Sequence, residues 1–273
     1  MTLKGTALKR VAWATDIHLD HVDPDVARGF FQELIAAKPD ALLLGGDIAV
    51  AETVETHLRQ IDMMVEFPVY FVLGNHDYYY GSIQDVRLQM RTLTHGSQHL
   101  RWLPEIGVAA LTPRTGLIGC GGWGDGRLGD FEHSDVRLND YVYINDLAAL
   151  DRVELLAAIR KLGQEAATHL NRVLPEALRR FEHILILMHV PPFAEACWHQ
   201  GRRGDAKWLP HYTCGAAGEV IHAAARDNMY HHFTVFCGHT HGHADVHLLP
   251  NLQIKTGGVE YGNPRIQEIM EVL

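Results

Sequence analysis

Five apolar runs of strand length end in polar residues that can bind metal ions. Branched and aromatic side chains dominate these runs, as in buried strands: residues 10–16, 41–44, 69–73, 183–190 and 233–237. The polar groups at their ends are Asp16 and His18, Asp47, Asn75 and His76, His189, and His239 and His241. These five polar clusters constrain the fold of the chain most strongly. A fold that brings the five strand ends together would combine the clusters into a single site.

The segments between the first three runs have helical features. Asp23 followed by Pro24 is a typical helix start, and an amphipathic pattern continues from there to about Lys38. A second helix is predicted over residues 52–66. Strands that alternate with helices at this spacing form parallel sheets with right-handed crossovers, and the carboxyl ends of parallel strands lie along one edge. We therefore expect an α/β fold in which the five polar clusters converge.

Later segments continue the same alternation. Ser82 and Asp85 form a plausible capping pair for a helix to about residue 96. Helical spacing over residues 147–181 is expected to be interrupted at Gly163 and Pro175, and a further helix is predicted near residues 216–227. Three short runs close the chain, and turn residues between them favour antiparallel strands that complete a sheet: 246–249, 252–256 and 266–270.

Two segments resist assignment to helix or strand. Residues 125–146 mix charged and aromatic side chains and are interpreted as a possible insertion near the site. Residues 194–214 lack periodicity and are predicted to form a long loop near the site. Loops of this length are more often functional than structureless. Residues 1–273 are predicted to form one domain, since the chain has no low-complexity linker and no internal repeat.

Composition narrows the class of protein. The 33 acidic residues outnumber the 24 lysines and arginines, and no dense basic run relieves the net charge of −9, so long nucleic acid is an unlikely partner. No apolar run is long enough to span a membrane and no signal peptide is evident, so we expect a cytoplasmic protein with no membrane partner. The cysteines are far apart in sequence and are expected to be buried free thiols: Cys120, Cys197, Cys214 and Cys237.

The donor types at the strand ends predict the kind of metal. Residues two apart at a strand end point to one face, so Asp16 with His18, and His239 with His241, can each bind one ion. Imidazole, carboxylate and amide donors together suit zinc, iron or manganese. Seven donors exceed what one ion needs, so two divalent transition-metal ions that share a bridging carboxylate are expected.

Five motifs in order give the chain a family resemblance. They are Asp16-Ile17-His18, Gly46-Asp47, Gly74-Asn75-His76-Asp77, His189 and Gly238-His239-Thr240-His241. With them the chain resembles the calcineurin-like metallophosphoesterases from about residue 11 to residue 260. The resemblance implies a four-layer α-β-β-α sandwich, in which two mixed β-sheets are flanked by helices and the metal site lies at the strand C-terminal edge.

The resemblance also implies a role for each motif residue. Asp16, His18 and His241 would hold the first ion, Asn75, His189 and His239 the second, and Asp47 would bridge the two. His76 would be catalytic and assist the leaving group. The implied enzyme is a binuclear metal-dependent phosphoric ester hydrolase, in which a metal-bridging hydroxide attacks small phosphodiesters or phosphomonoesters, with diesters slightly favoured.

Other readings stay open at this point. A non-catalytic protein-binding scaffold of the same fold and a nuclease of the same family are the alternatives to the small-phosphoester hydrolase. Asp77 either orients His76 or caps the next helix, and at most one of residues 78–80, all tyrosines, is expected to contact the substrate. Arg202, Arg203 and Lys207 either bind a second phosphate or, as we favour, form a solvated loop face. The oligomeric state is left open.

Overall fold

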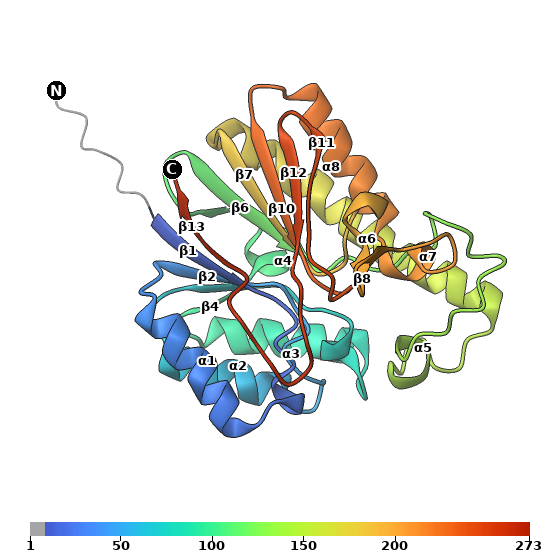
Figure 1. Cartoon of the computed structure of the whole chain (residues 1–273), viewed down its shortest axis with the longest axis horizontal. Coiled ribbons are helices and arrows are strands. Elements are labelled where there is room, and N and C mark those ends of the chain that lie inside the picture. The colour runs from blue at the N-terminus through green and yellow to red at the C-terminus, as the bar shows by residue number, and fades with distance from the viewer. Residues whose placement is uncertain (1–8) are drawn as a thin grey trace.

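The computed structural model describes residues 9–273 and contains two large β-sheets that pack face to face (Figure 1). The first sheet has the strand order β13-β1-β2-β3-β4, in which β13 is antiparallel to β1 and the other neighbours are parallel. Its strands are β1 (Lys9–Ala14), β2 (Ala41–Leu44), β3 (Val69–Phe71), β4 (Leu100–Trp102) and β13 (Glu268–Val272). The first eight residues of the predicted domain lie outside the described part.

The second sheet has the order β11-β12-β10-β7-β6-β5, with a parallel centre and an antiparallel strand at each edge. Its strands are β5 (Ala109–Ala110), β6 (Thr115–Cys120), β7 (His183–Met188), β10 (His232–Cys237), β11 (Ala244–Leu249) and β12 (Leu252–Thr256). As expected, β11 and β12 pair antiparallel, but the three C-terminal runs do not all close one sheet with antiparallel strands. β12 is parallel to β10, and β13 crosses to the other sheet and pairs with β1.

Helices cover the outer face of each sheet, which confirms the predicted four-layer α-β-β-α sandwich (Figure 1). The first sheet is covered by α1 (Pro24–Ala36), α2 (Val54–Met64) and α3 (Ile83–His95), and the second by α6 (Arg152–Arg180) and α8 (Gly215–Asp227). The predicted caps are present, because the side chains of Asp23 and Ser82 accept hydrogen bonds from the first turns of α1 and α3.

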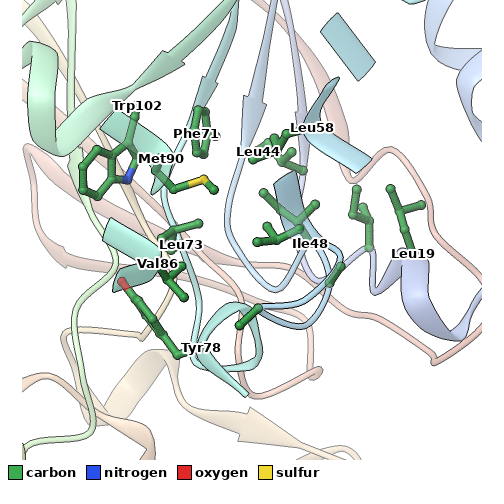
Figure 2. Close-up of a cluster of buried hydrophobic side chains, with 14 of the residues drawn as sticks. Leu19, Leu44, Ile48, Leu58, Phe71, Leu73, Tyr78, Val86, Met90 and Trp102 are labelled. Carbon is green, nitrogen blue, oxygen red and sulfur yellow. The ribbon is translucent and has the colours of Figure 1, made fainter. Parts of the chain in front are cut away.

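Alternating side chains divide the apolar core into three layers. Leu44 and Phe71 of the first sheet pack toward α2 and α3, where they belong to one buried cluster with Leu58 and Met90 (Figure 2). The side chains in between point the other way, and Trp13 packs against Phe236 of the second sheet with ring centroids 5.0 Å apart. Full burial of one large apolar side chain contributes about 1.5–3 kcal/mol, so the strands are anchored on both faces up to their carboxyl ends.

Helix α6 corrects the expectation of a break at Gly163 and Pro175, because it runs unbroken through both residues for 29 residues. A Cβ atom at Gly163 would overlap the buried side chain of Asp125, so glycine here allows a close contact and does not end the helix. Pro175 lies on the exposed face, where water can solvate the carbonyl that loses its backbone donor.

The two irregular segments lie against each other. Residues 194–214 were predicted to form a long loop, but they contain a 3₁₀ turn η3 (Ala194–Ala196), a hairpin of β8 (Trp198–His199) and β9 (Arg202–Arg203), and helix α7 (Leu209–Tyr212). Residues 125–146 are mostly irregular and include the short helix α5 (Asp140–Tyr143). His211 joins the two segments, because its ring nitrogens lie 2.7 Å from the Tyr141 hydroxyl and 3.0 Å from the Ser134 hydroxyl.

The remaining turns and short helices connect the main elements. They are the 3₁₀ turns η1 (Leu19–His21) and η2 (His76–Tyr78) and the helix α4 (Leu103–Ile106). All four cysteines are buried and free, as predicted. Between residues 9 and 273, no helix combines the length and the apolarity that crossing a membrane requires.

Candidate metal centre

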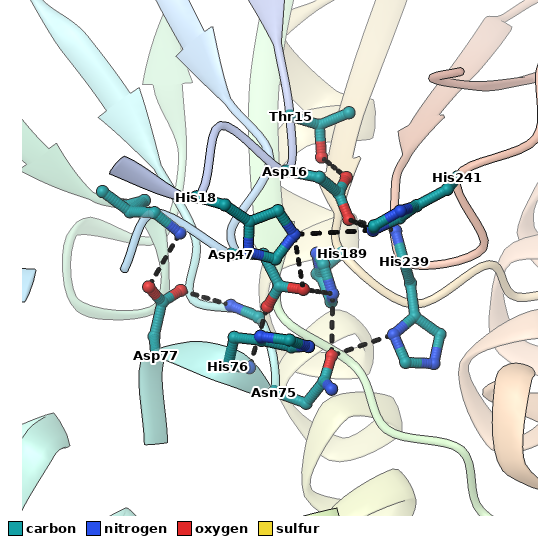
Figure 3. Close-up of polar contacts among 12 residues, drawn as sticks. Thr15, Asp16, His18, Asp47, Asn75, His76, Asp77, His189, His239 and His241 are labelled. Carbon is teal, nitrogen blue, oxygen red and sulfur yellow. Dashed lines mark hydrogen bonds and ion pairs between the residues drawn. The ribbon is translucent and has the colours of Figure 1, made fainter. Parts of the chain in front are cut away.

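The carboxyl ends of five strands, β1, β2, β3, β7 and β10, bring the seven predicted ligands to one place between the two sheets (Figure 3). These strands belong to the parallel parts of their sheets, so the loops that follow them leave from the same edge. Asp16, Asp47 and His189 are almost completely buried there. The site is therefore built into the ends of rigid elements.

The first group of donors comes from Asp16, His18, Asp47 and His241, which each offer one ligand atom within 4.8 Å of the others. The Nε2 atom of His241 lies 3.3 Å from Oδ1 of Asp16 and 3.4 Å from Nε2 of His18. Two imidazole nitrogens and a carboxylate oxygen thus point at one small volume. This arrangement fits a divalent cation with mixed nitrogen and oxygen ligands.

The second group of donors surrounds the amide oxygen of Asn75. This oxygen lies 3.0 Å from Nε2 of His189 and 2.9 Å from Nδ1 of His239. Asp47 lies between the two groups, because its Oδ2 atom is 3.3 Å from Nε2 of His189 and 3.8 Å from Nε2 of His18. A single carboxylate therefore faces both sets of donors.

The charge balance of the two groups favours bound cations. Burial lowers the pKa of His18 to about 4 and that of His239 to about 3, so both rings are neutral, which is the form that binds metal. Burial also opposes charge on Asp47 and His189. Even so, the carboxylates of Asp47 and Asp16 raise the pKa of His189 to about 10, and His189 in turn holds the pKa of Asp47 well below its usual range. The buried carboxylates thus attract the positive charge that a metal ion would supply.

Backbone conformation at the site is unusual and locally supported. Five of the seven residues have left-handed backbones, with φ between 39° and 69°: Asp16, His18, Asp47, His239 and His241. Such conformations cost of order 1–3 kcal/mol each and persist where the surroundings impose them. Glycines allow the necessary close approach, because a Cβ atom at Gly74 would overlap the Asp47 carboxylate and one at Gly238 would overlap Asp16.

Hydrogen bonds fix the orientation of the donors. The Asp16 carboxylate accepts from the hydroxyl of Thr15 at 2.6 Å and from the backbone N–H of His239 at 2.9 Å. Asp47 accepts from the backbone N–H of His76 at 2.9 Å. Nδ1 of His189 donates to the carbonyl of Gly45 at 2.9 Å, so its Nε2 atom faces Asp47 and is the nitrogen that a metal ion would bind in place of a proton.

Asp77 has neither of the two roles expected from sequence. Its buried carboxylate accepts the backbone N–H groups of Ile48 at 2.8 Å and Ala49 at 3.0 Å, and that of Gly74 at 2.8 Å (Figure 3). It therefore ties the loop after β2 to the loop after β3. The next helix is capped by Ser82 instead, and the described contacts of Asp77 do not include the His76 ring.

Asp140 is a positioning residue that could not be identified from the sequence. Its carboxylate accepts the Asn75 side-chain N–H at 2.8 Å and the Tyr79 hydroxyl at 2.8 Å. Because the amide nitrogen of Asn75 is bound to Asp140, its oxygen must face His189 and His239. Asp140 comes from the irregular segment 125–146, in which no periodicity or motif marks it.

His76 lies beside the two donor groups and outside them. Its ring stacks on Tyr79 with centroids 4.2 Å apart and meets the edge of His18 at 4.7 Å. It lines a cavity of about 180 Å³ over the centre, together with ligand residues and with His199 and Tyr212 from the segment 194–214. The ring is thus held in a fixed plane at the wall of the cavity.

The other sequence candidates are distributed as follows. Of the three tyrosines after His76, Tyr79 lines the cavity over the centre, while Tyr78 and Tyr80 do not. Arg202, Arg203 and Lys207 are exposed and do not line it. Arg203 pairs with Glu195 at 3.2 Å and Lys207 with Asp135 at 2.9 Å, as expected for a solvated loop face.

Comparison with protein families assigns most of the chain. A family model described as "Calcineurin-like phosphoesterase" matches residues 9–243. The matched range contains all seven predicted ligands and His76. A comparison with curated protein sequences returns no significant match.

Solved structures share the fold at low sequence identity. A phosphopantetheinyl hydrolase from Mycobacterium tuberculosis has a TM-score of 0.63 at 14% identity, over 98% of this chain and 97% of that one. A dimetal phosphatase from Danio rerio has a TM-score of 0.56 at 14% identity, with 92% and 87% covered. TT1561 of Thermus thermophilus has a TM-score of 0.55 at 13% identity, with 97% and 99% covered. These similarities concern the fold.

Proposed function

The chain belongs to the calcineurin-like phosphoesterase family, and we propose that it is a metal-dependent hydrolase of small phosphodiesters or phosphomonoesters. The observation that carries the proposal is the pair of donor groups that face the shared carboxylate of Asp47. One carboxylate between two sets of neutral and anionic donors is the arrangement that a two-metal phosphoesterase requires.

The donors divide into two sites around Asp47. Asp16, His18 and His241 hold one ion, and Asn75, His189 and His239 hold the other. Manganese, iron and zinc fit this mixture of nitrogen and oxygen donors. When bound, two such ions supply Lewis acidity and a water molecule of lowered pKa.

The protein's own contribution to substrate attraction is a low count of negative charges at the centre. Asp16 and Asp47 are the carboxylates among the seven proposed ligands, and the remaining donors are imidazoles and an amide, which add no negative charge. Two divalent cations therefore exceed the ligand charge by two. The centre attracts an anionic phosphoester although the chain as a whole carries −9.

His76 assists the departure of the leaving group in this proposal. Stacking on Tyr79 and the contact with His18 hold its ring at the wall of the cavity, free of metal. A ring in this position can donate a hydrogen bond or a proton to the ester oxygen as the bond to phosphorus breaks. The family resemblance supports the same role.

The proposed substrate is small. The cavity over the centre has a volume of about 180 Å³, which suits a phosphate group and its nearest atoms, and no lysine or arginine lines it. An acidic chain without a basic track also disfavours long nucleic acid. The alternative of a protein-binding scaffold is disfavoured because every ligand position is filled by a competent donor.

Metal analysis together with an activity panel tests the proposal. Protein loaded separately with manganese, iron or zinc should contain about two ions per chain and hydrolyse p-nitrophenyl phosphate or bis(p-nitrophenyl) phosphate. Chelation should abolish turnover, and added metal should restore it. Full metal occupancy without turnover on a broad phosphoester panel would overturn the proposal and favour the scaffold.

A further inference from the structure

A second, larger cavity adjoins the one over the metal centre. Its volume is about 720 Å³, within the usual range for small-ligand sites. The two cavities have four lining residues in common, His76, Tyr79, Asn139 and Tyr261. A molecule with its phosphate at the centre can therefore extend past His76 into the larger cavity.

Four of the ten residues that line this larger cavity are tyrosines. On one side, Tyr143 meets Tyr79 at 5.5 Å and Tyr80 at 5.1 Å between ring centroids. On the other side, Tyr261 meets His21 at 5.7 Å. Tyr80 and Tyr261 are 54% and 55% exposed, so both retain ring faces that a ligand could cover. We call this cavity, lined by Tyr79, Tyr80, Tyr143 and Tyr261, the tyrosine pocket.

The first wall of the tyrosine pocket is held in place by backbone contacts. The backbone N–H of Tyr80 donates to the carbonyl of Tyr143 at 2.8 Å, and that of Asn145 donates to the carbonyl of Gly81 at 3.1 Å. Tyr80 also has a left-handed backbone, with φ of 67°. The rings are therefore positioned before a ligand arrives, which lowers the entropy lost on binding.

The charge of the tyrosine pocket limits what it can bind. Its lining includes Asp20, which is paired with His21 at 3.4 Å, but no lysine or arginine. A second phosphate or a carboxylate would meet no cationic partner there. Tyrosine faces and edges instead favour a flat ring in an offset or edge-on arrangement.

We propose that the tyrosine pocket binds a planar, uncharged ring on the leaving group of the phosphoester whose phosphorus lies at the metal centre. The direction follows from His76, which lines both cavities and, under the proposed function, faces the leaving oxygen. The inference rests on that proposed function for the position of the phosphorus. It adds selectivity for one half of the substrate.

Matched substrates test the inference on the metal-loaded full chain. Adenosine 5′-phosphate and ribose 5-phosphate have the same leaving oxygen and differ in the ring, and each is assayed as the monoester and as its methyl diester. Within the ester class that the enzyme hydrolyses, monoester or diester, we expect kcat/KM to be about tenfold higher for the adenosine compound than for the ribose compound. Benzyl phosphate against ethyl phosphate tests a ring without a sugar, so the two series distinguish a nucleoside from an aryl alcohol.

Three variants locate the preference. Tyr143→Ala should reduce the adenosine-to-ribose ratio of kcat/KM from about tenfold to near one, whereas Tyr143→Phe keeps the ring and should keep the ratio. Tyr230→Ala is the matched control, because Tyr230 is 95% exposed and lies before β10, at the opposite end of the strand from the centre. It should leave both values of kcat/KM unchanged.

The outcomes separate this inference from the proposed function. Turnover with equal kcat/KM for all ring and ring-free pairs, or a ratio unchanged by Tyr143→Ala, overturns the tyrosine pocket and leaves the phosphoesterase standing. If no substrate is turned over, chemical-shift titration with adenosine and with ribose decides. If adenosine binds and Tyr143→Ala removes this binding, the tyrosine pocket is supported although the phosphoesterase is not. If adenosine and ribose bind equally, or neither binds, the tyrosine pocket is overturned.

Discussion

The metal centre and the walls around it are built by different means. The seven proposed ligands lie at the ends of buried strands, where packing on both faces leaves them little freedom. The walls come from single-turn helices and loops, which supply Asp140, Tyr143, Tyr212 and Tyr261. Loops tolerate sequence change more easily than strand ends do.

The difference indicates separate roles for the two regions, with turnover depending on the centre and substrate preference on the walls. Substitution in the centre should impair every substrate to a similar extent, since all phosphoesters use the same ions. Substitution in the walls should change which substrate is preferred. Substitutions can therefore show whether a residue belongs to the metal centre or to the walls, and Asp47 is expected to give the largest effect.

Asp47→Asn should cause the greatest loss, because Asp47 faces both groups of donors. Removal of its charge is expected to lower kcat/KM on the order of 10³-fold or more for monoesters and diesters alike, and to lower the metal content. Activity assays and elemental analysis measure the two effects. The control is Asp227→Asn, which breaks a surface ion pair with Arg226 and should change neither. Near-normal activity with one ion retained would remove Asp47 from its bridging role.

His76→Ala should separate turnover from metal binding. The ring lies outside both donor groups, so metal content should stay at the wild-type level while kcat falls by about 10²-fold. The loss should be larger for alkyl esters than for p-nitrophenyl esters, because nitrophenolate leaves without help. Loss of metal in this variant would contradict the assignment and place His76 among the ligands.

Asp140→Ala tests the boundary between wall and centre. The residue comes from the wall, yet its carboxylate orients the Asn75 amide toward His189 and His239. Affinity for the second ion is expected to fall about 10–100-fold, with recovery of activity at high metal concentration. Asp140→Asn keeps an acceptor oxygen and should lose less. A change in substrate preference with unchanged metal affinity would show that Asp140 acts only as a wall residue and does not support the metal centre.

Lys207→Ala should have the smallest effect. Lys207 is exposed and pairs with Asp135 at 2.9 Å, away from the lining of both cavities. We expect kcat/KM to change by less than about twofold, since exposed ion pairs contribute little. Steady-state assays with substrates that carry one or two phosphates measure it. A selective loss for the bisphosphate would show that this loop face binds a second phosphate after all.

The convergence of the seven proposed ligands could be predicted from the sequence because each of them follows a strand that can be recognised. An apolar run that ends in glycine and a polar cluster has few other interpretations, and the parallel order of the strands then predicts convergence. The same reasoning did not anticipate β4, since its three residues are too few to show a period. It also predicted an interruption of α6 at Pro175, but this residue is exposed, so the loss of one backbone hydrogen bond is tolerated.

The walls could not be predicted because their residues are placed by contacts distant in sequence. Asp140 meets Asn75 across 65 positions, and His211 meets Tyr141 across 70. No local pattern indicates such contacts, since Asp140, Tyr141 and His211 lie in α5 and α7, helices of four residues that are too short to show a period. The segments 125–146 and 194–214 were expected near the site, but the individual wall residues noted in advance were the tyrosines next to His76, of which Tyr79 lines the cavity over the centre.

The distance along the chain between the ligands has a consequence for biosynthesis. His18 and His241 are 223 positions apart, and β1, which precedes Asp16, is flanked in its sheet by β13, the last strand made. A nascent chain on the ribosome can fold its first strands and helices early, yet it lacks a proposed donor for each of the two donor groups until residues 239–241 emerge. Under the proposed function, metal is therefore acquired only after residue 241 has been made, and products truncated before it are expected to stay empty.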